Sequence, residues 1–291
     1  MQDMLHAAGP QAAQIGALWN LALWLCSAVF AAILVALGVA VWRAPRARED
    51  TPADVSPLQR DEPAARRGVA AAVGVSTVLL IAMLLASVFT DRALGALVLR
   101  DAVHIELTGH QWWWSVRYDD ADPSRIFTTA NEMHVPVGRP VIVTLRSDDV
   151  IHSLWIPNLA GKKDLIPGRT ATLALRADRA GTYRAQCAEF CGLQHAWMAL
   201  PVTAEPPERY EAWAAQQRRS ATAPSDPQAL RGQQVFLGST CAMCHAVVGT
   251  EAGAQHAPDL THLAGRTTLG AGALPNDAAH LAAWISNPQA H

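Results

Sequence analysis

The sequence predicts a membrane-anchored fold in three parts: two transmembrane helices, an antiparallel all-β Greek-key sandwich or barrel, and a small helical region at the C-terminus. Three observations predict it. Two long uncharged runs lie in the first ninety residues, and short β-rich runs with Pro and Gly between them follow. The last segment, residues 229–291, is rich in Gly and Ala with helical candidates at 229–237 and 277–286. Each pattern is typical of its structural class.

The composition excludes some functions before any motif is considered. The chain has 291 residues, of which 51% are hydrophobic and 16% charged, and 23 basic against 25 acidic residues give a net charge of −2. This near-neutral balance offers no electrostatic footprint for duplex nucleic acid, so we expect no nucleic-acid partner. Four of the five cysteines form two tight pairs, and these pairs point to the chemistry.

The two uncharged runs predict transmembrane helices at residues 15–42 and 68–90. Both exceed the roughly 20 apolar residues needed to cross ~30 Å of hydrocarbon. The alternative is a pair of buried helices in a soluble core, which seldom remain uncharged over such lengths.

The distribution of arginine predicts the orientation of these helices. The connector at 43–67 contains six arginines, whereas the N-terminal segment at 1–14 contains no lysine or arginine. The positive-inside rule therefore predicts a cytoplasmic connector. We expect a bacterial inner-membrane protein with both termini and the later domains on the periplasmic side. Because no basic segment precedes the first span, we expect any cleaved leader to be already removed.

The part after the spans divides into three segments. Residues 91–219 contain the β-rich runs and end in a predicted helix at 206–219. Residues 220–228 are small, polar and proline-containing, as in a linker. Residues 229–291 then form the last predicted domain.

The first candidate site is the segment CAEFCGLQHAWM at residues 187–198, together with one upstream histidine. It offers two thiolates, two imidazoles and a thioether, from Cys187, Cys191, His152, His195 and Met198. This is a ligand set that copper prefers, and two neighbouring thiolates can bridge two metal ions. The alternatives are a disulfide in an oxidising compartment and a structural zinc site, although zinc rarely takes methionine.

Around these residues the chain resembles subunit II of the haem-copper cytochrome oxidases, over residues 15–219. The resemblance lies in the two spans, the copper segment and three further motifs: GHQWWW at 109–114, DDVIHS at 148–153 and KKDLIPGR at 162–169. It implies a cupredoxin-like barrel and a dinuclear copper centre, CuA, bound by the five side chains above and by the backbone carbonyl of Glu189. It also implies that the Glu189 side chain binds Mg at the contact with subunit I, and that Trp112 receives electrons.

One position departs from the family pattern. Members often carry a glutamate at the start of the second span, as the mouth of a proton pathway, but here the sequence reads Arg66-Arg67-Gly68-Val69. Asp61 and Glu62 lie several residues earlier, and we interpret them as solvated connector charges.

The second candidate site is the CxxCH motif of Cys241, Cys244 and His245. In such a motif two thiols attach haem c covalently and the histidine is the proximal iron ligand. A redox CxxC pair or a partial zinc knuckle is the alternative. The surrounding residues resemble a class I cytochrome c domain, which implies a distal methionine. Since no methionine follows Met243, we expect the natural chain to continue past His291. The alternative is a second histidine ligand from His256, His262, His280 or His291.

Together these observations predict the electron-input subunit of a terminal respiratory oxidase of the caa type. In such a complex haem c receives electrons from an external cytochrome c or another donor, and CuA passes them to subunit I, where oxygen is reduced to water. The resemblance implies a proton-translocating enzyme complex with subunits I and III as partners. The alternatives are a membrane-anchored copper chaperone and the CuA domain of another reductase, such as nitrous oxide reductase.

Overall fold

The computed structural model describes residues 2–44 and 63–290 and divides the chain into two compact units. One unit is Gln14–Gly95, and the other combines Met1–Ala13 with Ala96–His291. Several residues considered above lie outside the described part: Arg46, Arg48, Arg60, Asp61, Glu62 and His291.

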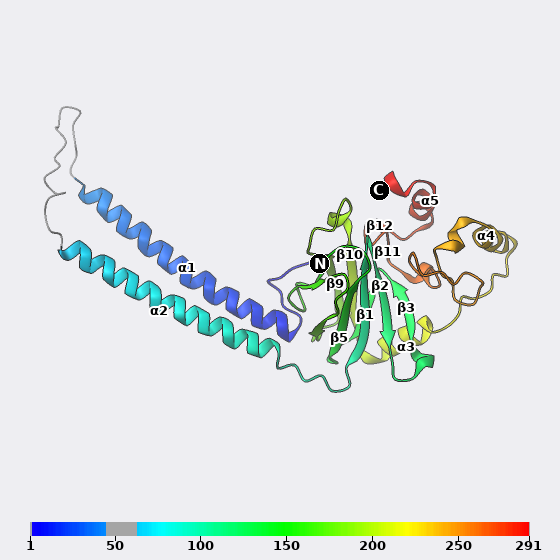
Figure 1. Cartoon of the computed structure of the whole chain (residues 1–291), viewed down its shortest axis with the longest axis horizontal. Helices are drawn as coiled ribbons and strands as arrows, with labels where there is room; N and C mark the ends of the chain where they lie inside the picture. The colour runs from blue at the N-terminus through cyan, green and yellow to red at the C-terminus, as the bar shows by residue number, and fades with distance from the viewer. Residues whose placement is uncertain (1, 45–62, 291) are drawn as a thin grey trace, which may run out of the picture. The chain divides into compact units, whose positions relative to one another are not determined.

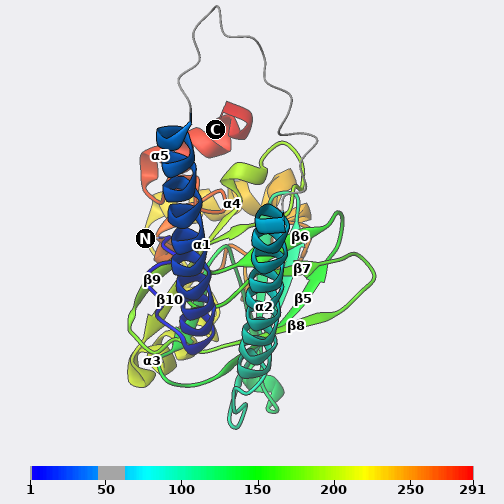
Figure 2. The same cartoon turned by 90° about the vertical axis from the view of Figure 1, so that its left-hand side faces the viewer.

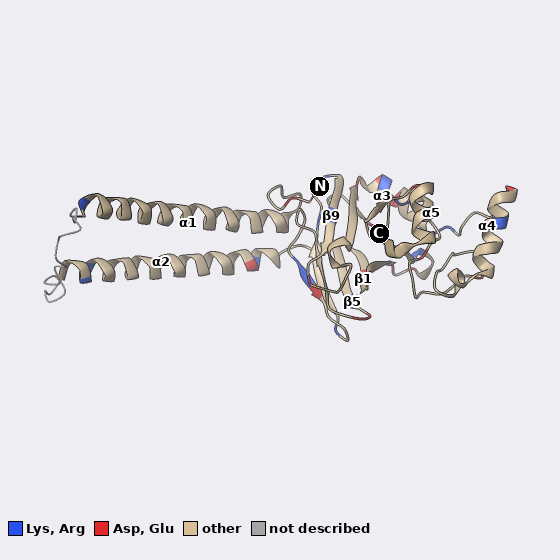
Figure 3. Cartoon of the chain, turned by 90° about the horizontal axis from the view of Figure 1, so that it is seen from above, with Lys and Arg blue, Asp and Glu red and all other residues tan. Residues whose placement is uncertain are grey.

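Two helices account for the uncharged runs, α1 at Pro10–Arg43 and α2 at Pro63–Leu94. They run antiparallel (Figures 1 and 2). Charged residues occur only near their ends, as Figure 3 shows. Helix α2 buries no residue, and α1 buries only Gln11 and Ala12 in its first turn. Both helices are therefore long and apolar enough to cross a membrane, with apolar side chains facing outward.

The β-rich runs form two five-stranded sheets, with strand orders β3-β2-β1-β5-β8 and β4-β10-β9-β6-β7. The first sheet contains β1 (Val103–His110), β2 (Trp113–Asp119), β3 (Phe127–Ala130), β5 (Val141–Ser147) and β8 (Ala171–Leu175). The second contains β4 (Met133–Pro136), β6 (His152–Trp155), β7 (Lys163–Leu165), β9 (Gly181–Cys187) and β10 (Ala199–Glu205). One hydrophobic core cluster draws residues from both sheets, including Leu107, Trp114, Leu154 and Leu200.

The β-rich stretch RIFTTANEMHVPV at 125–137 contains two strands, β3 and β4. Asn131, with φ of 58°, separates β3 from β4. Asparagine tolerates this left-handed conformation, and here its side-chain oxygen accepts from Trp114 N at 2.8 Å. The chain thereby passes from the first sheet to the second.

Two strand pairs are parallel, β1 with β5 and β4 with β10. An entirely antiparallel arrangement, as the regular spacing of the runs suggested, is therefore wrong. Parallel pairs need crossover connections, and the lengths of the runs do not reveal which strands cross.

The two sheets and their shared core are called the barrel below. Helix α3 (Pro207–Gln217) packs against it, and its Trp213 stacks on His134 at 4.0 Å between ring centroids. The N-terminal segment also belongs to this unit. Ala8 N donates to Asn158 O at 2.7 Å, and Ala12 N donates to Leu159 O at 3.2 Å. The segment that ends with the first residues of α1 is thus hydrogen-bonded to the β-sheet domain.

The C-terminal region contains α4 (Pro227–Gly238), α5 (Ala278–Ser286) and a two-stranded sheet of β11 (Thr268–Leu269) and β12 (Leu274–Pro275). Asp226 and Asp277 cap the two helices by accepting backbone hydrogen bonds. Neither helix, described over its whole length, buries a residue. Among the described residues, the core cluster of the barrel contains none after Ala214.

Candidate metal and haem sites

The residues of the first candidate site come from one end of the second sheet. His152 begins β6 and Cys187 ends β9, and these two strands pair. The other donors lie in the loop between β9 and β10, which contains the short 3-10 helix His195–Trp197 and ends at Met198, immediately before β10. The sheet therefore fixes the two ends of the loop that carries the donors.

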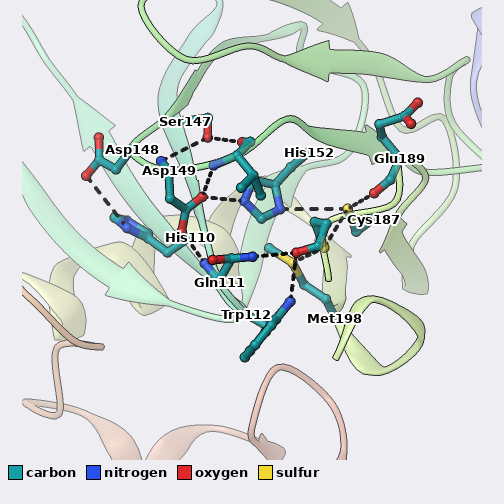
Figure 4. Close-up of polar contacts among 12 residues, drawn as sticks. His110, Gln111, Trp112, Ser147, Asp148, Asp149, His152, Cys187, Glu189 and Met198 are labelled. Atoms are coloured by element: carbon teal, nitrogen blue, oxygen red, sulfur yellow. Dashed lines mark hydrogen bonds and ion pairs between the residues drawn. The ribbon is translucent and has the colours of Figure 1, made fainter. Parts of the chain in front are cut away.

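The donor atoms converge around two sulfurs (Figure 4). Cys187 Sγ lies 3.7 Å from Cys191 Sγ, 3.8 Å from His152 Nδ1 and 3.2 Å from the Glu189 carbonyl oxygen. Cys191 Sγ lies 3.7 Å from His195 Nδ1 and 3.8 Å from Met198 Sδ. Each thiol thus has one imidazole and one further donor beside it, which is the arrangement that two ions sharing both sulfurs require.

The two cysteines are free thiols in this structure. A disulfide has its sulfurs about 2.05 Å apart, much closer than the 3.7 Å between Cys187 and Cys191. Both are buried, as are Met198 and His152, while His195 is half-buried. A buried set of soft donors suits copper, and His152, Cys187 and Cys191 meet the geometric requirement for a metal site.

Asp149 orients the buried imidazole of His152. Its Oδ1 accepts from His152 Nε2 at 2.8 Å, and its Oδ2 accepts from Gln111 N at 2.6 Å. With Nε2 occupied, Nδ1 is the nitrogen that faces Cys187. A carboxylate that holds the far nitrogen of a ligand histidine fixes the tautomer and raises the basicity of the ligand. Asp149 lies within the family motif DDVIHS. Its position three residues before His152 is the one sequence signal that could have indicated that it orients the histidine.

The two thiols differ in acidity. Burial opposes ionisation of Cys187, but hydrogen bonds with His152 and the backbone at Glu189 outweigh it, so the pKa of Cys187 is lowered. Burial and repulsion from the Cys187 thiolate raise the pKa of Cys191. The metal-free chain therefore favours a thiolate at Cys187 and a thiol at Cys191. Binding of metal by both sulfurs would release the Cys191 proton.

Trp112 and Gln111 donate hydrogen bonds to the loop that carries the metal donors. Trp112 Nε1 donates to the Cys191 carbonyl at 3.0 Å, and Gln111 Nε2 donates to the same oxygen at 2.7 Å. Trp114 is fully buried in the core, whereas Trp112 is half-buried. Of the tryptophans in the triplet, Trp112 is thus the one in contact with the loop.

Two glycines, which sequence reasoning did not single out, make room for the site. A Cβ atom at Gly109 would lie 2.8 Å from His152 Cδ2. At Gly192, which has φ of 115°, it would lie 3.0 Å from Trp112 and from Gln111. Only glycine combines this φ with so close an approach.

Glu189 presents its two oxygen-bearing groups in different directions. Its carbonyl oxygen faces Cys187, while its carboxylate extends away from the sulfurs (Figure 4). The residue is exposed. The carboxylate is thus available for a hard cation, whereas the carbonyl belongs to the sulfur cluster.

The second candidate site follows α4. Cys241 lies in a 3-10 helix at Thr240–Met243, and Cys244 follows it directly, so both thiols are on the same short turn and both are exposed. His245 Nδ1 donates to Pro258 O at 2.7 Å, which leaves Nε2 for iron. His262 Nε2 lies 2.9 Å from Arg219 O, and His280 Nδ1 lies 2.6 Å from Asp277 Oδ2.

The C-terminal region exposes apolar side chains as well as the two thiols. Helices α4 and α5 bury no residue of their own, and the exposed apolar residues of this region include Leu230, Val235, Met243, Val248 and Ile285. A porphyrin attached at Cys241 and Cys244 would offer apolar surface for such side chains to pack against. The donor set and the apolar surface are therefore both consistent with haem c.

Comparisons with known proteins match the two regions of the chain that carry these sites. Residues 121–205 match the family model "Cytochrome C oxidase subunit II, periplasmic domain", and residues 229–291 match the model "Cytochrome c". The chain thus joins a region similar to the subunit II periplasmic domain to a region similar to cytochrome c. The two domains imply copper and haem c, and the fold class predicted from the sequence is confirmed.

Curated relatives of the subunit II domain include cytochrome c oxidase subunit 2 of Alkalihalophilus pseudofirmus. It is 39% identical over 189 residues, which cover 65% of this chain and 53% of the relative. The same subunit of Branchiostoma floridae is 36% identical, covering 38% of this chain and 55% of the relative. The chain thus spans about half the length of these relatives. Among solved structures, the periplasmic domain of subunit II from Bradyrhizobium japonicum is 29% identical over 42% of this chain and 97% of that chain, with a TM-score of 0.39.

Proposed function

We propose that this chain is the electron-input subunit of a terminal respiratory oxidase, receiving electrons at haem c and passing them through CuA to subunit I, where oxygen is reduced to water. Each bound group supplies one-electron redox chemistry. The observation that carries the proposal is the convergence of two thiols, two imidazoles, a thioether and one carbonyl oxygen in a chain that also carries a CxxCH motif.

The chain's own residues have three tasks in this proposal. Cys187, Cys191, His152, His195, Met198 and the Glu189 carbonyl would hold the copper pair, with the two thiolates as the ligands that both ions could share. Asp149 holds the His152 ring so that its Nδ1 faces the metal. Cys241 and Cys244 attach the haem, and Pro258 orients His245 through the hydrogen bond to Nδ1.

Two further roles concern the surface of the copper site. The exposed carboxylate of Glu189 binds Mg where subunit I covers the site. Trp112 receives electrons, because its indole touches the backbone of the ligand Cys191 and its half-buried ring reaches the surface.

The helices α1 and α2 anchor the chain in the bacterial inner membrane against subunit I, with subunit III as a further partner. The metal-bearing domains and both termini lie on the periplasmic side, where an external cytochrome c or another donor delivers electrons. Arg43, Arg66 and Arg67, at the helix ends nearest the connector, support a cytoplasmic connector.

Rapid photoreduction of the purified, copper-loaded and haem-loaded chain tests this function. A covalently attached photosensitiser reduces the haem within a flash, and the haem and copper absorbances are followed separately. We expect the haem to be reoxidised at the same rate as copper is reduced, with a rate independent of protein concentration. Reduced haem that persists beside oxidised copper would contradict the proposal. The Cys191→Ser variant serves as the control that lacks an intact acceptor.

A further inference from the structure

The C-terminal region touches the barrel at two places that lead directly to the two proposed redox sites. Ala199 N donates to Ala271 O at 2.8 Å. The guanidinium of Arg266 lies against Thr129 and Glu132 of the barrel. Both contacts lie within the same compact unit.

The first contact joins a turn of the cytochrome c region to the residue after Met198. The turn Gly270–Gly272 has positive φ at all three residues, and a Cβ at Gly272 would lie 3.0 Å from Ala199 Cβ. Ala199 and Ala271 are each 1% exposed. The Met198 carbonyl in turn accepts from Cys187 N at 2.9 Å. The turn therefore packs closely against the backbone that carries a proposed copper ligand.

The second contact joins the loop that orients His245 to strand β3 and the turn that follows it. Arg266 is 7% exposed, and its Nη2 donates to Asp259 O at 2.5 Å and to Thr129 Oγ1 at 3.4 Å. Its Nε lies 3.8 Å from Glu132 Oε1. Asp259 follows Pro258, whose carbonyl holds His245. One guanidinium thus connects the haem-ligand loop to the barrel.

A buried pair of opposite charges favours the one arrangement of the two domains that brings the charges together. Glu132 is 8% exposed, and without Arg266 its buried carboxylate would lose the guanidinium and keep only the Thr129 hydroxyl at 3.0 Å and His134 Nε2 at 3.9 Å. This loss is strongly destabilising for the arrangement that buries it. The linker at 220–228 by itself would allow the two domains many relative positions. The interface contacts select one of them.

We propose that the cytochrome c region is held in one docked position on the copper domain, with Arg266 as the positioning residue and the Ala271–Ala199 hydrogen bond as the contact beside Met198. This inference rests on the proposed function. With both groups bound, this docked position would serve the transfer of one electron from reduced haem c to the oxidised copper pair. No bond forms or breaks, and no proton is transferred.

Amide hydrogen exchange tests the docking without reference to activity. The Ala199 amide donates to the cytochrome c region, so its protection reports docking directly. In the full chain with copper and haem bound, resolved to single amides, we expect Ala199 to be protected. In Arg266→Met its exchange should accelerate at least about tenfold, while amides in the barrel core keep their protection. Rapid exchange of Ala199 in the parent chain would overturn the proposal.

Two further variants separate docking from folding. Gly272→Val places a bulky side chain against Ala199 without touching the Arg266–Glu132 pair, and we expect it to release Ala199 as well. Arg176→Met removes an arginine that pairs with Asp178 at 2.6 Å elsewhere on the barrel, and it should leave Ala199 protected. If Arg266→Met and Gly272→Val both leave Ala199 protected, the inferred interface is wrong.

The positioning role predicts a change in the viscosity dependence of electron transfer. In the parent chain the flash-induced transfer should not depend on solvent viscosity, because no domain movement precedes it. In Arg266→Met the transfer should slow at least tenfold, in the range that misplacement of a reacting group produces, and should become viscosity-dependent, while the copper and haem spectra stay unchanged. A viscosity-independent, unchanged rate would overturn the role of Arg266. If Ala199 is protected but no copper is reduced in the parent, the proposed function fails and the docking stands.

Discussion

Asp149 Oδ1 accepts a hydrogen bond from His152 Nε2 at 2.8 Å, so a carboxylate that is about one-third exposed fixes the ring of a fully buried histidine. The same carboxylate binds Gln111 N, one residue before Trp112. Asp149 therefore connects the proposed copper ligand with the loop that holds the proposed electron-receiving tryptophan.

Replacing Asp149 tests whether its hydrogen bond to His152 contributes to copper binding. We expect Asp149→Asn to lower copper affinity about 10- to 100-fold, because a neutral amide holds the His152 tautomer less strongly. Competition with a chelator of known affinity measures the change. The control is Asp148→Asn, since Asp148 is exposed and lies 3.6 Å from His110 Nδ1 rather than near a ligand. Equal affinities in the two variants would rule out the role assigned to Asp149.

Replacing one bridging thiol tests the sharing of two coppers. We expect Cys191→Ser to fold but to retain at most one tightly bound copper, because a hydroxyl is a poor ligand for soft copper. Copper analysis of the purified chain, with circular dichroism to check the fold, measures this. Cys26→Ser, in α1, is the matched control and should keep both ions. Two coppers with an unchanged spectrum in Cys191→Ser would overturn the ligand assignment.

The Glu189 side chain can be tested separately from its carbonyl. We expect Glu189→Gln to retain CuA, since the carbonyl near Cys187 is unchanged, and to weaken Mg binding in the complex with subunit I. The copper spectrum and the Mg content of the purified complex are the two measurements. Glu208→Gln, at the start of α3, provides a control that changes charge elsewhere. Loss of both coppers from a folded Glu189→Gln chain would show that the carboxylate is itself a copper ligand.

Gly109 allows a test through packing. A Cβ there would lie 2.8 Å from the His152 ring, so Gly109→Ala should displace the ring and lower the free energy of unfolding by about 1–3 kcal/mol. Denaturant unfolding of the metal-free chain gives the free energy, and copper titration shows the displaced ligand. Gly253→Ala has open space around the added methyl group and should change neither. An unchanged stability and copper affinity in Gly109→Ala would mean that the ring is free to move aside.

Much of the fold could be predicted because its signals are local. The uncharged runs gave α1 and α2, and most of the strands lie within a few residues of the β-rich runs. The change of sheet at Asn131 and the parallel pair of β1 and β5 could not be predicted, since both depend on contacts between segments far apart in the chain.

The candidate copper site could likewise be predicted only in part. The types and spacing of the residues from Cys187 to Met198 suggested copper, because soft donors at short intervals have few other uses. Gly109, Gly192 and Asp149 act through distance and backbone conformation, which only the folded chain reveals. The same is true of Arg266, whose buried contact with the barrel joins residues more than a hundred positions apart.

Electron paramagnetic resonance of the oxidised, copper-loaded chain, combined with metal analysis, tests the central claim most directly. If Cys187 and Cys191 bridge two ions, the chain should bind two coppers and show one unpaired electron with hyperfine splitting from two equivalent copper nuclei. One copper per chain, with splitting from a single nucleus, would contradict a dinuclear centre at these residues.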